Sequence, residues 1–308
     1  MDFFRSSERP QVAIEQLPIW VQNPSAVSLY LLREDLIPLA VSGNKFRKLR
    51  YNYQKLLADD LEHMISFGGA HSNHISALAQ LGNTCNVKTV GIIRGEELAD
   101  KTLNPTLQMA TKNGMELHFV SRSDYRLKEN SPAIRLIIDN YPNAMVIPEG
   151  GTNDLAVKGC EDILGEHTVS YTHICVAVGT GGTLAGMIRA SNEGQQLLGF
   201  SALKGAFQSE EIKRFTDRTN FELTDEASRG GYAKVDAQLV SFINEFKERT
   251  SIQLDPIYTS KMMWGILDRI KAGRFPKNSR ILAVHTGGLQ GIPAMNQILI
   301  KKQLPPIW

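Results

Sequence analysis

Cysteine is scarce in this sequence, which has three cysteines among its 308 residues: Cys85, Cys160 and Cys175. No two of them have the spacing of metal ligands, and three thiols cannot all pair, so neither a zinc site nor a disulfide framework is expected. We interpret them as reduced thiols, buried as small apolar residues in a cytoplasmic protein.

An excess of charge of one sign is also missing, because 34 lysines and arginines nearly balance 32 aspartates and glutamates. A formal net charge of +2 creates no strong field that would attract nucleic acid or a membrane surface. No apolar run approaches the roughly 20 residues that a membrane span needs, and residues 1–10 carry no apolar signal-peptide core. We therefore expect a cytoplasmic protein whose partner is a small molecule.

Short apolar runs alternate with segments of helical periodicity along the whole chain. This alternation predicts an α/β fold with mostly parallel sheets, and 308 residues favour two domains over a single core. The polar segment 204–235 shows no clear pattern. The expected strands are 27–32, 63–67, 87–93, 117–120, 144–147, 173–178, 197–203 and 280–285. The expected helices are 46–57, 72–81 ending at Gly82, 103–113 ending at Gly114, one from 184, 239–249 and 262–270.

Four of the predicted strands end in polar turns that contain glycine, at residues 67–74, 148–152, 178–183 and 285–288. Ligands of open α/β sheets bind outside the carboxyl ends of the strands, so four such turns predict one site built from several strand ends. The alternative is that these glycines only punctuate turns, and for any single turn both interpretations stay open.

The turn at Gly179 is the best candidate for an anion site. Its glycines would let backbone N–H groups converge on a phosphate at the start of the following helix. A dinucleotide is not expected, because Leu184 stands where the third glycine of that fingerprint belongs, and no Gly-Lys-Ser/Thr of a Walker loop follows. His71 and His74 have no carboxylate at a recognised spacing, so no metal site is predicted.

Two helix starts and one turn carry side chains that could do chemistry. Ser72 and Asn73 fit either an ordinary N-cap or a cradle for a substrate carboxylate. Lys45 lies near a helix N-terminus, where a positive charge is unfavourable. A Schiff base or a nearby phosphate would offset that charge, although an exposed lysine is the usual alternative. Tyr258 is either a packing residue or part of the site.

Residues 42–49, Ser-Gly-Asn-Lys-Phe-Arg-Lys-Leu, resemble the GGNK-x-RKLE segment of the 1-aminocyclopropane-1-carboxylate deaminase and D-cysteine desulfhydrase family. Arg33-Glu34-Asp35 is similar to its (K)RED, residues 71–74 to QSN[HQ], 255–259 to DPVY[TE], and 285–288 to H[TL]GG. The matches run in family order from about residue 27 to 290. The resemblance implies a two-domain fold-type II pyridoxal-phosphate enzyme, related to tryptophan synthase β, with an open twisted sheet flanked by helices in each domain.

The resemblance also implies a role for each matched position. Lys45 would be the Schiff-base lysine and would move the α-proton, with Ser72 and Tyr258 as further catalytic residues. The cofactor would contact Lys45, Asn73, Gly179, Thr180, Gly181, Gly182, Thr183 and Thr286. The substrate would contact Ser72, Asn73, His74, Tyr232, Tyr258 and Thr259. We expect a large cofactor-binding domain of residues 1–47 and 151–308, a small domain of residues 48–150, and a homodimer.

Two positions separate the activities within the family. Ring-opening deaminases carry Glu after the DPVY tyrosine and Leu after the strand-end histidine, whereas D-cysteine desulfhydrases carry Ser or Thr at both. Here these positions are Thr259 and Thr286, and His74 also follows the desulfhydrase pattern. A hydroxyl beside the pyridine nitrogen gives a weaker electron sink than a carboxylate. That sink suffices for a thiolate leaving group, whose conjugate acid has a pKa of about 8.5.

The sequence also departs from the family pattern around the expected substrate. Ser42 replaces a glycine, His71 replaces a glutamine, and residues 229–234 differ from the family's PGYG. These departures lie around the substrate pocket. From Thr259, Thr286 and His74 we expect β-elimination of D-cysteine to sulfide, pyruvate and ammonia. The 1-aminocyclopropane-1-carboxylate deaminase reaction and a pyridoxal-phosphate-binding protein without turnover are the alternatives.

Overall fold

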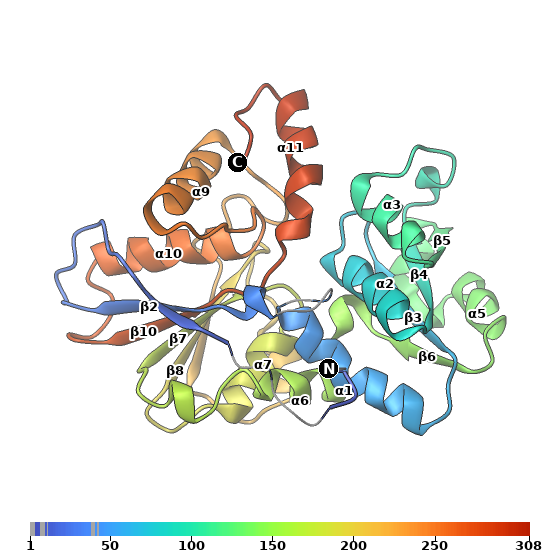
Figure 1. Ribbon diagram of the computed structural model, residues 1–308, viewed down its shortest axis with the longest axis horizontal. Coiled ribbons are helices and arrows are strands. Elements are labelled where there is room, and N and C mark those ends of the chain that lie inside the picture. The colour runs from blue at the N-terminus through green and yellow to red at the C-terminus, as the bar shows by residue number, and fades with distance from the viewer. Residues whose placement is uncertain (1–3, 7–9, 11, 38–40, 42) are drawn as a thin grey trace.

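The computed structural model describes residues 4–6, 10, 12–37, 41 and 43–308, so Ser42 lies outside the described residues. Two sheets organise the chain (Figure 1). The larger has the order β1-β2-β10-β7-β8-β9, and all its strand pairs are parallel except β1 with β2. Its strands are β1 Ile14–Leu17, β2 Ser28–Leu32, β7 His173–Val178, β8 Gln196–Ser201, β9 Phe221–Thr224 and β10 Arg280–Val284.

The smaller sheet has four parallel strands in the order β5-β4-β3-β6, all from one continuous part of the chain. They are β3 His63–Gly68, β4 Lys88–Arg94, β5 Glu116–Val120 and β6 Ala144–Ile147. The predicted α/β fold with mostly parallel sheets is confirmed. The predicted domain boundary at residues 47–48 falls inside the first helix, and the domain division itself stays a prediction.

Helices cover both faces of each sheet (Figure 1). Apolar side chains of α9, α10 and α11 pack on one face of the larger sheet, and those of α6, α7 and α8 on the other. The smaller sheet lies between α1, α2 and α3 on one face and α4 and α5 on the other. The helices are α1 Asn44–Ala58, α2 Asn73–Cys85, α3 Pro105–Lys112, α4 Arg122–Leu127, α5 Pro132–Asp139, α6 Asp154–Glu161, α7 Gly182–Ala190, α8 Ser209–Lys213, α9 Ala237–Thr250, α10 Thr259–Lys271 and α11 Ile292–Lys301.

The predicted helix stop at Gly82 is wrong, because α2 continues through it to Cys85 and ends at Asn86 in a left-handed conformation. Gly82 serves packing instead: a Cβ there would lie 2.7 Å from the Thr89 side chain on the neighbouring strand. Segment 204–235, which had no predicted structure, contains α8 and the edge strand β9. No helix in the described part of the chain is long and apolar enough to cross a membrane.

Helix α1 lies between the two halves of the molecule (Figure 1) and is held by close backbone contacts. Gly43, with φ +65°, precedes it, and a Cβ at this position would lie 2.2 Å from the Thr286 carbonyl oxygen after β10. A Cβ at Gly159 of α6 would lie 1.9 Å from the Arg47 carbonyl oxygen. Only glycine fits at either contact, so α1 is fixed against both α6 and the end of β10.

A buried ion pair also anchors α1. The Arg47 guanidinium donates to both carboxylate oxygens of Glu34, at 2.9 and 2.8 Å, and both side chains are almost completely buried. Removing one partner of such a pair is costly, because the remaining charge has lost its water and its counterion.

We therefore expect Glu34→Gln to lower the free energy of unfolding by about 3–5 kcal/mol. The exposed pair of Lys55 and Asp59, 2.7 Å apart at the C-terminal end of the same helix, provides the control. Asp59→Asn should change stability by less than about 1 kcal/mol, because water screens that pair. Urea unfolding followed by circular dichroism measures both, and equal effects would contradict this account of α1.

Candidate functional site

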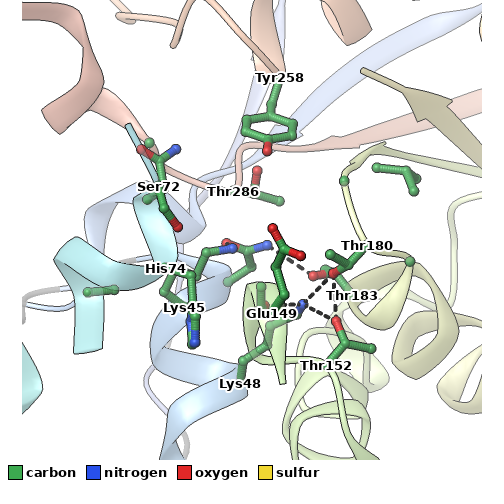
Figure 2. A pocket seen from close by; sticks show the side chains of 18 of the residues that line it. Lys45, Lys48, Ser72, His74, Glu149, Thr152, Thr180, Thr183, Tyr258 and Thr286 are labelled. Carbon is green, nitrogen blue, oxygen red and sulfur yellow. Dashed lines mark hydrogen bonds between the residues drawn. The ribbon is translucent and has the colours of Figure 1, made fainter. Parts of the chain in front are cut away.

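The carboxyl ends of strands from both sheets open onto one cavity of about 1390 Å³. All four glycine-containing turns line it, together with the start of α1 and Tyr258 (Figure 2). The predicted site residues that line it are Lys45, Ser72, Asn73, His74, Gly179, Thr180, Gly181, Thr183, Tyr232, Tyr258 and Thr286. Gly182 and Thr259 do not line it.

Lys45 lies in the first turn of α1, at the centre of this cavity (Figure 2). Burial lowers the pKa of its amine from the ordinary 10.5 to about 8, which the charge of Asp255 offsets only in part. The sequence already indicated that a charged lysine is unfavourable at this helix start. Near neutral pH a usable fraction of the amine is therefore uncharged and can act as a nucleophile or a base.

Lys48, which the sequence analysis did not single out, is the second amine of the site. Its Nζ donates hydrogen bonds to the Gly150 carbonyl at 2.9 Å, Thr152 Oγ1 at 2.9 Å and Thr180 Oγ1 at 3.3 Å (Figure 2). Burial and then the charge of Lys45 lower the pKa of Lys48 to about 7. The sequence did contain one signal for Lys48, its spacing from Lys45, because residues three apart share one face of a helix.

The turn from Gly179 to Thr183 meets the Lys48 amine and has the geometry of an anion cradle. Gly181, at φ +95°, is the N-cap of α7, so free backbone N–H groups of that helix face the cavity. A Cβ at Gly150 would lie 2.6 Å from the Thr180 side chain, and one at Gly182 would lie 2.8 Å from that of Thr152. Glycine at these positions leaves space among hydroxyl, amide and ammonium donors, a donor set that fits a phosphate group.

Ser72 caps α2, since its Oγ accepts the backbone N–H of Ile75 at 3.3 Å. The same hydroxyl and the Asn73 amide line the cavity at the positive end of that helix. The N-cap and the cradle for an anionic substrate group are therefore compatible, because both use the N-terminus of one helix.

His74 has a different environment from the one its predicted role requires. Its ring is buried, with Nε2 2.8 Å from Ser66 Oγ, and that hydroxyl donates to the Ile147 carbonyl at 2.8 Å. The hydroxyl therefore accepts from Nε2–H, and burial keeps the pKa of His74 well below its ordinary value. Nδ1 is then an acceptor, without a partner among the described residues, so direct donation to a substrate carboxylate does not fit this arrangement.

Thr259 lies outside the cavity and supports the turn beside it. Its hydroxyl is completely buried and donates to Asp255 Oδ1 at 2.7 Å. The same carboxylate accepts the backbone N–H groups of Ile257, Tyr258 and Thr259, at 2.9, 3.0 and 2.6 Å. Asp255, which the sequence analysis noted only as part of a motif, thus fixes the turn that carries Tyr258.

Tyr258 covers the cavity from the side opposite α1 (Figure 2). A Cβ at Gly179 would lie 3.3 Å from the Tyr258 hydroxyl, so the phenol sits directly on the glycine turn. Its ring makes an edge contact with Tyr232, with the ring centres 6.1 Å apart. Burial raises the pKa of Tyr258 well above its ordinary value, so this phenol stays protonated at neutral pH.

Comparison with known proteins agrees with this geometry. A family model described as pyridoxal-phosphate dependent enzyme matches residues 11–287. A Thermotoga maritima protein named "Putative 1-aminocyclopropane-1-carboxylate deaminase" is 29% identical over 295 residues, which cover 89% of this chain and 92% of the relative. A D-cysteine desulfhydrase of Serratia proteamaculans is 26% identical over 288 residues, or 84% of this chain and 86% of the relative.

A solved structure described as an ACC deaminase homologue superposes with a TM-score of 0.79 at 25% sequence identity. The match covers 95% of this chain and 94% of the other. Lys45, the Gly179 turn and the Ser72 helix start all lie within the region that the family model matches.

The two lysines can be distinguished by their titration. In protein labelled with ¹³C at lysine Cε, the Lys48 resonance should titrate near pH 7, and it should be missing in Lys48→Met. Inorganic phosphate should raise this pKa, because a nearby anion favours the charged amine. An unchanged pKa at saturating phosphate, or a Lys48 that titrates near 10.5, would contradict the anion cradle.

Proposed function

Since the chain belongs to the family of pyridoxal-phosphate-dependent enzymes, we propose that it is a lyase that eliminates sulfide from D-cysteine, giving pyruvate and ammonia. One observation carries this proposal: the half-buried Lys45, whose amine has a pKa of about 8, lines the same cavity as the anion cradle of residues 179–183. A reactive amine that shares a cavity with an anion site suits a phosphorylated aldehyde cofactor.

The residues present fit pyridoxal phosphate. Lys48, Thr180 and the N-terminus of α7 would hold its phosphate, and Lys45 would hold its aldehyde carbon. Thr286, which lines the cavity at the end of β10, would face its pyridine nitrogen. When bound, the cofactor withdraws electrons from the Cα of an amino acid and so makes the Cα proton removable.

The protein's own groups would perform the remaining tasks. Ser72 and Asn73 bind the substrate carboxylate at the positive end of α2. The Lys45 amine then takes the proton from Cα, which its lowered pKa allows near neutral pH. The neutral Tyr258 phenol donates a hydrogen bond or a proton to the sulfur as the Cβ–S bond breaks. Water completes the conversion of the remaining three-carbon unit to pyruvate and ammonia.

Thr286 supports D-cysteine over 1-aminocyclopropane-1-carboxylate as the substrate. A hydroxyl beside the pyridine nitrogen does not hold a proton there as a carboxylate would, so ring opening is less favoured than loss of a thiolate. Thr259 no longer contributes to this argument, because Asp255 occupies its hydroxyl. The ring-opening deaminase is the second candidate, and it is favoured by the names of the Thermotoga relative and of the solved homologue.

We expect the purified protein with pyridoxal phosphate to show the visible absorption band of the lysine-bound cofactor, and to release sulfide and pyruvate from D-cysteine. Lys45→Ala should lose the band and the turnover, because the second amine, Lys48, is held beside the glycine turn by three hydrogen bonds. A band without products from D-cysteine would exclude the desulfhydrase reaction, and 1-aminocyclopropane-1-carboxylate in the same assay tests the second candidate. A wild-type band with no product from any amino acid would support binding without turnover.

Tyr258→Phe should keep the absorption band and lower kcat for D-cysteine by about 10²-fold, the lower end of what a positioned proton donor contributes. The matched control is Tyr171→Phe, whose phenol packs against Tyr30, outside the cavity. Steady-state kinetics at pH 7.5 measures both variants. A kcat unchanged from the wild-type value in Tyr258→Phe would remove this phenol from the mechanism.

A further inference from the structure

Besides the solvent-exposed Glu129, three charged side chains line the cavity on the side of the smaller sheet and take no part in the proposed chemistry. They are Arg94, Lys128 and Glu149. Arg94 is the last residue of β4, Lys128 follows α4, and Glu149 lies in the turn after β6. We call these three residues the charged wall. Strand ends that meet at one edge of a sheet are where substrate contacts collect in α/β proteins.

Lys128 and Glu149 neutralise each other within this wall. Lys128 Nζ lies 2.8 Å from Glu149 Oε2 and 3.3 Å from the centre of the Tyr125 ring. The Lys128 backbone has φ +53° and ψ −133°, a conformation that residues with a side chain rarely adopt. Strained backbone of this kind persists where the surrounding structure holds it, and it is concentrated at ligand sites. The strain here places an ammonium group at the cavity and holds the Glu149 carboxylate.

Arg94 is the residue of the charged wall whose charge the Lys128–Glu149 pair does not neutralise. No carboxylate lies within salt-bridge distance of its guanidinium in the described part of the chain, and nearby Glu97 pairs with Arg122 at 2.7 Å. A Cβ at Gly69 would lie 3.4 Å from the Arg94 guanidinium, so this cation stands over the turn that leads to Ser72. Burial raises the pKa of Tyr232, which also lines the cavity, and the positive charge of Arg94 partly offsets that rise.

The cavity must hold the cofactor as well as the amino acid, and its volume of about 1390 Å³ exceeds the roughly 300–1,000 Å³ that is usual for a small-molecule site. Arg94 lines this cavity beside the turn that leads to Ser72, so a substrate side chain can extend toward its guanidinium. Within the charged wall only the guanidinium lacks a counterion, so an anionic group is the complementary occupant.

We propose that Arg94 selects the substrate's side chain, and that the site favours amino acids whose side chain ends in an anionic group. This inference rests on the proposed function, because it assumes that an amino acid binds with its α-carboxylate at Ser72. The favoured class includes the thiolate of cysteine and, as its clearest member, a side chain that ends in a carboxylate. Because the charges of Lys128 and Glu149 cancel, Arg94 remains the charge of this wall that a substrate side chain meets.

The test compares two amino acids of nearly equal shape. Calorimetry on the enzyme loaded with pyridoxal phosphate measures the binding of aspartate and asparagine, each as both enantiomers. Aspartate should bind at least about tenfold more tightly than asparagine of the same chirality, the effect of one charge-assisted contact. In Arg94→Gln the ratio should fall to near one. Arg122→Gln, which removes an exposed arginine already paired with Glu97, should keep the wild-type ratio.

Glu149→Gln gives a second and opposite test. It removes the only carboxylate of the charged wall and frees Lys128, so the preference for aspartate should increase several-fold. Equal binding of aspartate and asparagine, no binding of either, or a preference that survives Arg94→Gln would each overturn the inference. Sulfide release from D-cysteine without the preference would reject the subsite alone. A preference that depends on Arg94 without sulfide release would reject the desulfhydrase reaction and leave the subsite in place.

Discussion

The burial of positive charge on helix α1 is the constraint on which the rest of the site depends. Lys45, Arg47, Lys48 and Arg50 follow one another within two turns, and each must leave bulk water as α1 packs between the two sheets. An isolated cation in the interior is costly, so each requires a partner or a lowered pKa. Arg47 and Arg50 have carboxylate partners in Glu34 and Asp162.

The two lysines meet the same constraint without a carboxylate. Lys48 directs its three donors at a carbonyl and two hydroxyls, so its ammonium is solvated by the protein and placed beside the glycine turn. Lys45 donates one long hydrogen bond, to Asn44 Oδ1 at 3.5 Å, and burial lowers its pKa to about 8, while that of Lys48 falls to about 7. The hydrogen bonds therefore distinguish the two amines: Lys48 is fixed against the glycine turn, whereas the Lys45 amine remains available in the cavity, although the two residues are only three positions apart.

The sequence predicted the parts of this molecule that depend on local pattern. Periodicity identified most strands and helices, and the glycine turns after strands indicated which side chains meet in one cavity. Lys48 was missed because a lysine on a basic helix is usually exposed, and it is the turns at Gly150 and Thr180, far along the chain, that enclose its amine. Matched positions also did not all prove to be cavity residues. Thr259 does not line the cavity, and the Thr259 hydroxyl and the His74 Nε2 are occupied by Asp255 and Ser66, four and eight residues away along the chain. The motifs alone do not show which side chains pair in this way.

The glycine contacts between helices have a mechanical consequence for this cavity. At Gly159 of α6, and again at Gly186 of α7, whose Cβ would lie 2.4 Å from the Val157 carbonyl oxygen of α6, no side chain separates the neighbouring backbones. Helices α1, α6 and α7 therefore form one stiff block that carries Lys45, Lys48 and the glycine turn together. Ser72 and Arg94 reach the same cavity from the smaller sheet. A ligand that contacts this block and those two residues therefore bridges the two sheets.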